Sequence, residues 1–524
     1  MRNEVFNRNR SRLILRPGIQ RFGGVVLCGF ILLAASLGFA ETEGPVQPLK
    51  VFSSACDIPS DGIREELTRE GLEEIIGGLN AKLAVMRDKY LWQDGKWETV
   101  LRNGLIKIGM WWRFADVTAW VFRTLGDDAS AGKTFFFIMP FLNWMCEPFF
   151  LPVDSGFSEG QQEEEMAGIA RFITLKEEEG VAVSLAPVHG GSLSQDEASR
   201  YLRFCTQIIR HLAARDDIEE IHLSLKLSGL VAEWNGLQNA ADRESTALND
   251  ERDKVAEAKE VLTKLLVVAN EAEGKRALLR IDMEDYAYKA ATLAVFKNVV
   301  EENPSIVRNA DGTLRLGIVI QACLRDAYQD LDDLARWGKR NDLLVPVTLV
   351  KGAYEKHGEA FPIGKEGSMS PVWNNRESID AGFEKLCEFL MLNMDVFQPA
   401  FATDNIRSMA HVMGSAGSYG IGKSEFEFQM LCGMGDEIKE VITTMGYGMR
   451  VTVPAGTQAQ GMEYALGRFS ELADPDNDLT RALRGDYSLF QGPAPRFTGA
   501  EDIDDAEPLE ALVVASRVRC FGKE

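Results

Sequence analysis

The chain has 524 residues, of which 45% are hydrophobic and 26% are charged, and its formal net charge at pH 7 is −22. These proportions are typical of a soluble fold with a large core, and the length exceeds that of a single barrel of ~250 residues, so one large enzyme with an additional domain is expected. The acidic balance, without a basic stripe that carries interleaved aromatic residues, argues against a nucleic-acid partner.

Residues 1–40 differ in composition from the rest of the chain. Six arginines precede an apolar run from Val25 to Phe39, and small residues at Gly38 and Ala40 stand before Glu41. The run is short for a transmembrane helix, so the pattern predicts a secretory signal peptide and an exported or periplasmic protein. An uncleaved N-terminal membrane anchor is the main alternative. A mitochondrial transit peptide is a weaker one, because the apolar block is continuous rather than amphipathic.

Residues 41–165 are predicted to form a helical region. From about Pro59 to Met145 apolar residues recur at helical spacing, and tryptophan and phenylalanine residues cluster between Trp111 and Phe137. Apolar residues at this spacing are usually core, so we expect an N-terminal helical domain or arm packed on the domain that follows. The unusually apolar stretch from Phe135 to Pro152 offers an alternative, which is peripheral contact with a membrane or its quinone pool.

Between residues 180 and 455 one unit repeats eight times: a short run of β-branched and apolar residues, a polar or glycine-rich turn, and an amphipathic helical stretch. Strands separated by helix-length segments need crossover connections, so the sheet is predicted to be parallel and buried. Eight such units are the number that closes an α/β fold of the (β/α)8 TIM-barrel type. We therefore expect a barrel over residues 166–480 and a C-terminal tail, 481–524, that packs on it. The runs are Val181–Leu185, Glu220–Lys226, Ala277–Asp282, Leu316–Gln321, Val345–Lys351, Ala400–Thr403, Glu425–Gln429 and Arg450–Pro454.

Six of these runs end in a polar residue. Because active sites of such barrels lie at the C-terminal ends of the strands, these side chains are expected to face one mouth. Taken alone, each is most often the start of a solvated loop, and an aspartate there can simply cap the next helix. A lysine and an aspartate on adjacent strands, with a Lys-Gly turn on a third, favour a joint functional site. The six residues are Lys226, Asp282, Gln321, Lys351, Thr403 and Gln429.

The loop after the fifth strand, from Lys351 to about Glu377, is long and contains four glycines. Long loops in this position commonly close over ligands, and the turn at Lys351-Gly352-Ala353 lets the backbone approach a flat ring or a phosphate closely. No Rossmann fingerprint and no complete P-loop accompany it. The eight cysteines and five histidines show no ligand spacing and no nucleophile–base pattern, so neither a metal site nor a catalytic triad is predicted.

The segment Leu349–Tyr354 resembles the hallmark of the proline dehydrogenase family, an FAD-dependent barrel that is also found in bifunctional proline-utilization proteins. Six further segments match in the family's order, one per strand, so the resemblance covers roughly residues 180–475. They are Ser224–Ser228, Ile281-Asp282, Val319–Ala322, Phe401–Asn405, Phe426–Leu431 with Gly433–Gly435, and Val453–Thr457.

The resemblance implies FAD over the strand ends, oxidation of L-proline or a related cyclic imino acid to pyrroline-5-carboxylate by hydride transfer to the flavin, and a quinone as electron acceptor. Carried over by position, Lys226 and Arg468 would hold the substrate carboxylate, since paired cations favour an anionic group. Asp282 would orient and partly neutralise that cluster, and Tyr354 would pack against the substrate ring. Cofactor contacts are implied for Gln321, Val350, Lys351, Gly352, Ala353, Thr403, Asn405 and Gln429, with Arg376 as a phosphate partner and Glu471 holding a neighbouring group.

Several positions depart from the family's pattern. Losing a charge-assisted contact costs about 1.5–3 kcal/mol, or roughly ten- to a hundredfold in binding, so a substrate other than proline and weak binding of proline are both open alternatives. A barrel that has lost its chemistry and serves as an exported binding or structural protein is the alternative function. The departures are Gly467 in place of the first arginine of a pair completed by Arg468, Thr348 in place of an arginine near the reactive nitrogen of the flavin, Thr452 in place of a tyrosine over the substrate, Glu355 in place of a tryptophan, and Asp404 in place of a histidine beside the cofactor.

Overall fold

The computed structural model describes residues 69–92, 149–153, 159–189, 191–234, 245–272, 274–352, 370–472, 477–483, 495–498 and 500–521. The chain divides into two compact units, and all described residues belong to the unit made of residues 54–115 and 148–524. The predicted leader, residues 1–40, and the aromatic cluster between Trp111 and Phe137 lie outside the described residues.

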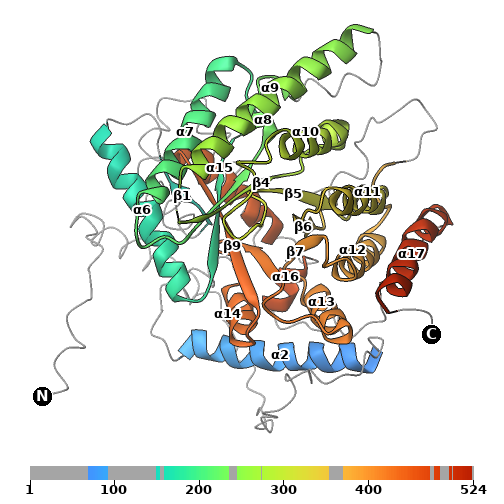
Figure 1. The fold of residues 1–524 in the computed structure, drawn as a ribbon. Helices are drawn as coiled ribbons and strands as arrows, with labels where there is room; N and C mark the ends of the chain where they lie inside the picture. Colours follow the sequence, from blue (N-terminus) through green and yellow to red (C-terminus); the bar gives the residue numbers. More distant parts are fainter. Residues whose placement is uncertain are drawn as a thin grey trace, which may run out of the picture. The chain divides into compact units, whose positions relative to one another are not determined.

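Eight parallel strands form a closed barrel at the centre of this unit (Figure 1). Each strand pairs with the next along the chain, and β9 pairs with both β8 and β2, which closes the ring. A two-residue strand, β1 (Leu151–Pro152), is added to β9. The predicted (β/α)8 barrel is therefore confirmed. Its strands are β2 (Ala182–Pro187), β3 (Glu220–Leu225), β4 (Arg276–Ile281), β5 (Leu316–Gln321), β6 (Val345–Val350), β7 (Phe397–Ala402), β8 (Glu427–Leu431) and β9 (Gly448–Gly456).

Helices separate the strands and cover the outside of the barrel (Figure 1). Several begin at a side-chain cap, as α13 does at Asn405, whose oxygen accepts a hydrogen bond from the amide of Ser408; such a cap satisfies one of the free amides of the first turn. The helices are α6 (Glu159–Glu178), α7 (Gln195–Ala213), α8 (Leu227–Leu230), α9 (Ser245–Asn270), η3 (Tyr286–Tyr288), α10 (Lys289–Glu302), α11 (Ala327–Arg340), α12 (Arg376–Met391), α13 (Ile406–Tyr419), α14 (Asp436–Thr444) and α15 (Gln458–Leu472).

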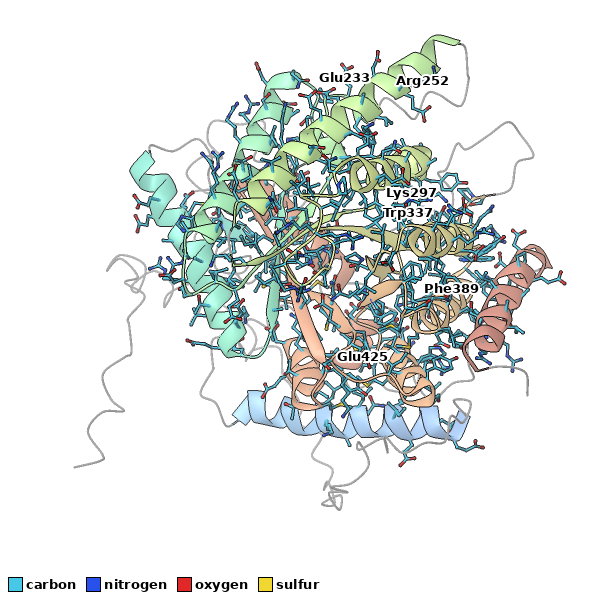
Figure 2. All side chains as sticks on the ribbon, viewed as in Figure 1. Glu233, Arg252, Lys297, Trp337, Phe389 and Glu425 are labelled. Carbon is cyan, nitrogen blue, oxygen red and sulfur yellow. The ribbon has the colours of Figure 1, made fainter. Side chains whose placement is uncertain are left out.

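The core lies between the strands and these helices, where large apolar side chains fill the space (Figure 2). Phe389 of α12 is fully buried, and its ring centroid lies 6.3 Å from that of Phe397 in β7. Trp337 of α11 packs edge-on against Phe296 of α10. Burial of an aromatic side chain of this size contributes about 1.5–3 kcal/mol relative to exposure, so these contacts hold the helical layer onto the sheet.

Three further helices belong to the same unit. In the predicted N-terminal helical region, α2 (Arg69–Trp92) is described, and it packs on α13 and α14. After the barrel come α16 (Asp478–Leu483) and α17 (Ala500–Phe521), and α17 packs on α11 and α12. The contact includes a buried carboxylate, Asp502, which pairs with Arg325 at 2.5 Å and accepts a hydrogen bond from Ser378. Within the described ranges, no helix has both the length and the hydropathy needed to cross a bilayer.

Candidate active site at the carboxyl ends of the strands

Polar residues end or directly follow five neighbouring strands, β3 to β7, at one edge of the parallel barrel. Backbone hydrogen bonds show that the strand ends are adjacent: the amide of Asp282 donates to the carbonyl of Leu225, and the amide of Ala322 donates to that of Val350. The polar residues therefore meet at one mouth, as predicted. They are Lys226 after β3, Asp282 after β4, Gln321 at the end of β5, Lys351 after β6 and Thr403 after β7.

Lys226 and Asp282 stand on adjacent strands. The side chain of Lys226 is exposed, and its ammonium group makes no ion pair with any residue in the described part of the chain. Asp282 is held from below, since the hydroxyl of Ser224 donates to its Oδ1. The neighbouring Glu284 accepts hydrogen bonds from the amide and the hydroxyl of Ser228, at 3.1 and 2.5 Å, and burial raises the pKa of its carboxyl. The mouth thus offers an exposed cation beside an oriented carboxylate.

Gln321 ends the next strand, β5, and Gly352 follows the strand after it, β6. The side-chain Nε2 of Gln321 donates to the backbone carbonyls of Met283 and Glu284, both at 3.3 Å. The side-chain Oε1 of Gln321 is buried and has no partner among the described residues. Gly352 has a φ of +108°, and a Cβ atom there would collide with the sulfur of Cys323. Only glycine fits this position, because the left-handed backbone and the close sulfur both exclude a side chain.

A carboxylate from α16 lies among the cations of β6 and α12. The Oδ2 of Asp478 is 2.8 Å from Nη2 of Arg376 and 3.9 Å from Nζ of Lys351, and it also accepts a hydrogen bond from the Nδ2 of Asn405. Lys351 pairs in addition with Asp380. Burial alone would lower the pKa of Lys351, but the two aspartates outweigh it and the pKa is raised. We call the Asp478-binding group formed by Lys351, Arg376 and Asn405 the anion seat.

Asp404 and Thr403 lie beside this seat. The hydroxyl of Thr403 accepts a hydrogen bond from the amide of Asn405 at 3.1 Å, which fixes the turn into α13. Burial, reinforced by the nearby charge of Asp478, raises the pKa of the Asp404 carboxyl. In the family's pattern this position is a histidine, which is neutral or positive. Asp404 instead places a carboxyl group beside the anion seat.

Residues 170–481, more than half of the chain, match the family model of proline dehydrogenase. This chain belongs to the proline dehydrogenase family. It is 28% identical to proline dehydrogenase 1 of Bacillus subtilis (strain 168) over 279 residues, which are 53% of this chain and 74% of that protein. It is 27% identical to the proline dehydrogenase of Deinococcus radiodurans over 263 residues, 50% of this chain and 70% of that one. As a member of this family the chain is an oxidoreductase.

Among solved structures, proline utilization A (PutA) from Bdellovibrio bacteriovorus has a similar fold, with a TM-score of 0.59 and 22% sequence identity. The match covers 81% of this chain but only 45% of that one, so this chain spans less than half the length of the PutA protein. The similarity supports the barrel fold.

Arg280 is a candidate functional residue that was not predicted from the sequence. It is 5% exposed inside the barrel, and its guanidinium donates to Ser224 at 2.8 Å, to Thr348 at 3.4 Å and to Gln429. Its Nε lies 3.5 Å from Oδ1 of Asp282. Side chains two residues apart on a strand share a face, so the signal was available: Arg280 had to point into the lumen with Asp282. The guanidinium of Arg280 thus reaches Thr348, the residue that stands where the family's pattern has an arginine.

The prediction that Gln429 ends its strand is wrong. β8 continues to Leu431, two residues further, and Gln429 pairs in register with Ala402. Its side chain points into the lumen, where Nε2 donates to Glu427 at 2.7 Å and Oε1 accepts from Arg280. The lumen below the mouth is therefore filled by a hydrogen-bonded network instead of opening to the site.

The remaining predicted residues lie on α15 or outside the described part of the chain. On α15 the guanidinium of Arg468 stacks over the ring of Tyr464, 5.2 Å from its centroid. Gly467 is exposed, and a Cβ placed on it would meet nothing within 4 Å. Ala353, Tyr354 and Glu355 lie outside the described residues, and Glu471 lies in α15. Thr452 lies in β9, where it pairs in register with Leu431 of β8.

A cavity of about 810 Å³ opens at the opposite, amino-terminal end of the barrel. Arg450 lies at its wall and pairs with Glu220 and Glu427, each at 2.8 Å. His222 also lines it, and burial, followed by the nearby arginines, lowers the pKa of its imidazole well below the usual value. This end of a TIM barrel generally serves stability, and the paired charges here close the ring of strands.

Proposed function

We propose that this chain oxidises L-proline, or a related cyclic imino acid, to pyrroline-5-carboxylate, with FAD as the hydride acceptor and a quinone as the final electron acceptor. One observation carries the proposal: a cation and a carboxylate suited to a small amino acid, Lys226 and Asp282, lie at the same end of the barrel as the anion seat. The names of the B. subtilis and D. radiodurans relatives support proline as the substrate class.

The residues at this mouth fit FAD. Gln321 offers a buried acceptor oxygen that no described residue binds, which suits an N–H group at the edge of a flat ring. Gly352 removes the side chain that would stand between backbone and ligand. The anion seat already binds a carboxylate, so its donors are arranged for a negative group such as a phosphate. When bound, FAD would supply the two-electron acceptor, and the protein would supply orientation and electrostatics.

The chain's own residues would place the substrate. The exposed ammonium of Lys226 binds the substrate carboxylate, and Arg468 assists it from α15. Asp282, fixed by Ser224 and Arg280, keeps Lys226 in the cluster and partly offsets its charge. The overall reaction removes a hydride from the ring carbon next to nitrogen and a proton from the nitrogen, which leaves a C=N bond.

The visible spectrum of the purified protein tests this function. Protein reconstituted with FAD should absorb in the visible, and addition of L-proline without oxygen should bleach that absorbance. Reoxidation by a soluble quinone should restore it. A colourless protein that cannot be reconstituted would refute the flavin, and bound flavin that proline does not bleach would refute proline as the substrate.

Restoring the missing arginine should improve the binding of proline. Gly467→Arg adds a cation next to Arg468, and the open space around Gly467 admits the side chain. One charge-assisted hydrogen bond contributes about 1.5–3 kcal/mol, so the KM for L-proline should fall roughly tenfold or more. Gly467→Ala is the matched control, since it has the same helix-favouring effect without the charge. Equal KM values for the two variants would show that the substrate carboxylate does not reach position 467.

We also propose that the chain is exported or periplasmic, through residues 1–40 acting as a cleaved leader or a retained anchor, with peripheral membrane contact to reach a quinone. The arginines followed by an apolar run support this. Determination of the N-terminal residue of the protein from its source tests it: Glu41 indicates cleavage, and Met1 in a soluble fraction would contradict export.

A further inference from the structure

Asp478 occupies a position where three anion-binding groups converge. Asp478 is 6% exposed, and the groups that bind its carboxylate come from three different parts of the fold: Lys351 after β6, Arg376 at the start of α12 and Asn405 at the cap of α13. Asp478 itself belongs to a fourth element, the six-residue helix α16. The donors therefore belong to the barrel, and the anion comes from a short helix beyond it.

The donors of this seat are set to bind an anion. The amide oxygen of Asn405 accepts from the backbone of Ser408 at 3.0 Å, so its Nδ2 is the end that faces Asp478. Asn405 is the N-cap of α13, a helix of 14 residues, and the positive end of the helix dipole lies beside the carboxylate. A guanidinium, an amide N–H group and a helix N-terminus are the partners that phosphate takes in proteins.

The charges around the seat oppose the binding of a further anion beside Asp478. Among the described residues here, three carboxylates, those of Asp380, Asp404 and Asp478, accompany two cations, Lys351 and Arg376. A phosphate added beside Asp478 would increase this excess of negative charge, and the phosphate and the Asp478 carboxylate would repel each other. Arg376 is 38% exposed, so solvent and ligands can reach it.

We propose that Asp478 is an internal competitor for phosphate: its carboxylate holds the anion seat in this structure, and the pyrophosphate of the cofactor must displace it. Asp478 thereby sets the affinity of the chain for phosphate-bearing flavins. The identity of the cofactor rests on the proposed function, whereas the competition concerns any pyrophosphate-bearing ligand. An unchanged α16 in the loaded protein would contradict this proposal.

The test compares the wild-type apoprotein with Asp478→Asn by titration calorimetry. Asparagine keeps the shape and removes the charge, so inorganic pyrophosphate and FAD should each bind at least tenfold more tightly to the variant. Riboflavin, which has no phosphate, should bind equally to both. Asp505→Asn is the matched control, because it removes one aspartate charge from α17, where Asp505 pairs with Arg325 at 2.9 Å. Equal or weaker binding of pyrophosphate to Asp478→Asn would overturn the proposal.

Two outcomes separate this inference from the proposed function. If pyrophosphate binds more tightly to Asp478→Asn but FAD binds to neither protein, the flavin assignment fails and the competition stands. If the wild type binds FAD and is bleached by proline while both affinities are unchanged by the substitution, the competition fails and the function stands. Should the variant not fold, a crystal structure of the wild type with pyrophosphate decides, since Asp478 must then have left Arg376.

Discussion

Replacing Lys226 with methionine should raise the KM for L-proline by roughly ten- to a hundredfold. Lys226 is an exposed cation of the mouth, next to the oriented carboxylate of Asp282, and the substitution removes a charge-assisted contact of about 1.5–3 kcal/mol while keeping most of the length of the side chain. A contact made equally in the ground state and in the transition state changes KM and leaves kcat. Steady-state kinetics with proline and a soluble quinone measure both constants.

The matched control for this variant is Lys264→Met. Lys264 is an exposed lysine on α9 that pairs with Glu260 four residues earlier. Its loss removes the same charge without touching the mouth, so both kinetic constants should stay at the wild-type values. An unchanged KM in Lys226→Met would assign the carboxylate to Arg468 alone and remove Lys226 from the site.

The barrel could be predicted from the sequence because its strands are buried on both faces. All six residues of β5 are buried, and such a strand reads as a continuous apolar run with the same bounds in sequence and structure. The predicted strand bounds are wrong where a strand contains polar residues or proline. β7 begins at Phe397, three residues before the predicted run, because Gln398 and Pro399 interrupt the apolar pattern.

The strand-end rule predicts part of the site from the sequence. That rule places Lys226, Asp282 and Lys351 at one mouth, because each follows its strand directly. Arg280 lies within a strand, and its contacts with Thr348 depend on the closure of the ring across 68 residues of chain. Asp478 lies 73 residues after Asn405, on a helix whose return to the mouth no local pattern encodes. Contacts of this kind follow from tertiary structure alone.

Arg450 connects its own strand to three others at the amino-terminal end of the barrel. It lies on β9 and is 6% exposed, and its guanidinium binds Glu427 of β8 and Glu220 of β3, each at 2.8 Å, and the carbonyl of Val183 of β2 at 3.2 Å. One side chain thus spans the closure between the last strand and the first. Its removal would leave two partly buried carboxylates without their cation.

Replacing Arg450 with methionine should therefore lower the free energy of unfolding by about 3–5 kcal/mol, the usual cost of removing one partner from a buried ion pair. Chemical denaturation at pH 7 measures it. Arg336→Met is the control, because Arg336 is 58% exposed and its pairs with Asp332 and Asp333 contribute about 1 kcal/mol or less.

The dependence of this loss on pH follows from Glu427. Burial would raise the pKa of Glu427, but Arg450 outweighs it and the pKa is lowered in the folded chain. In the wild type this group therefore adds stability above its unfolded pKa, and that contribution is lost as the pH falls through the folded one. Without Arg450, burial dominates and the pKa of Glu427 should rise. The difference in the free energy of unfolding between variant and wild type should therefore become smaller as the pH falls. If this difference in the free energy of unfolding stays the same from pH 7 down to pH 4, the packing of the arginine stem, and not its charge, holds the barrel closed.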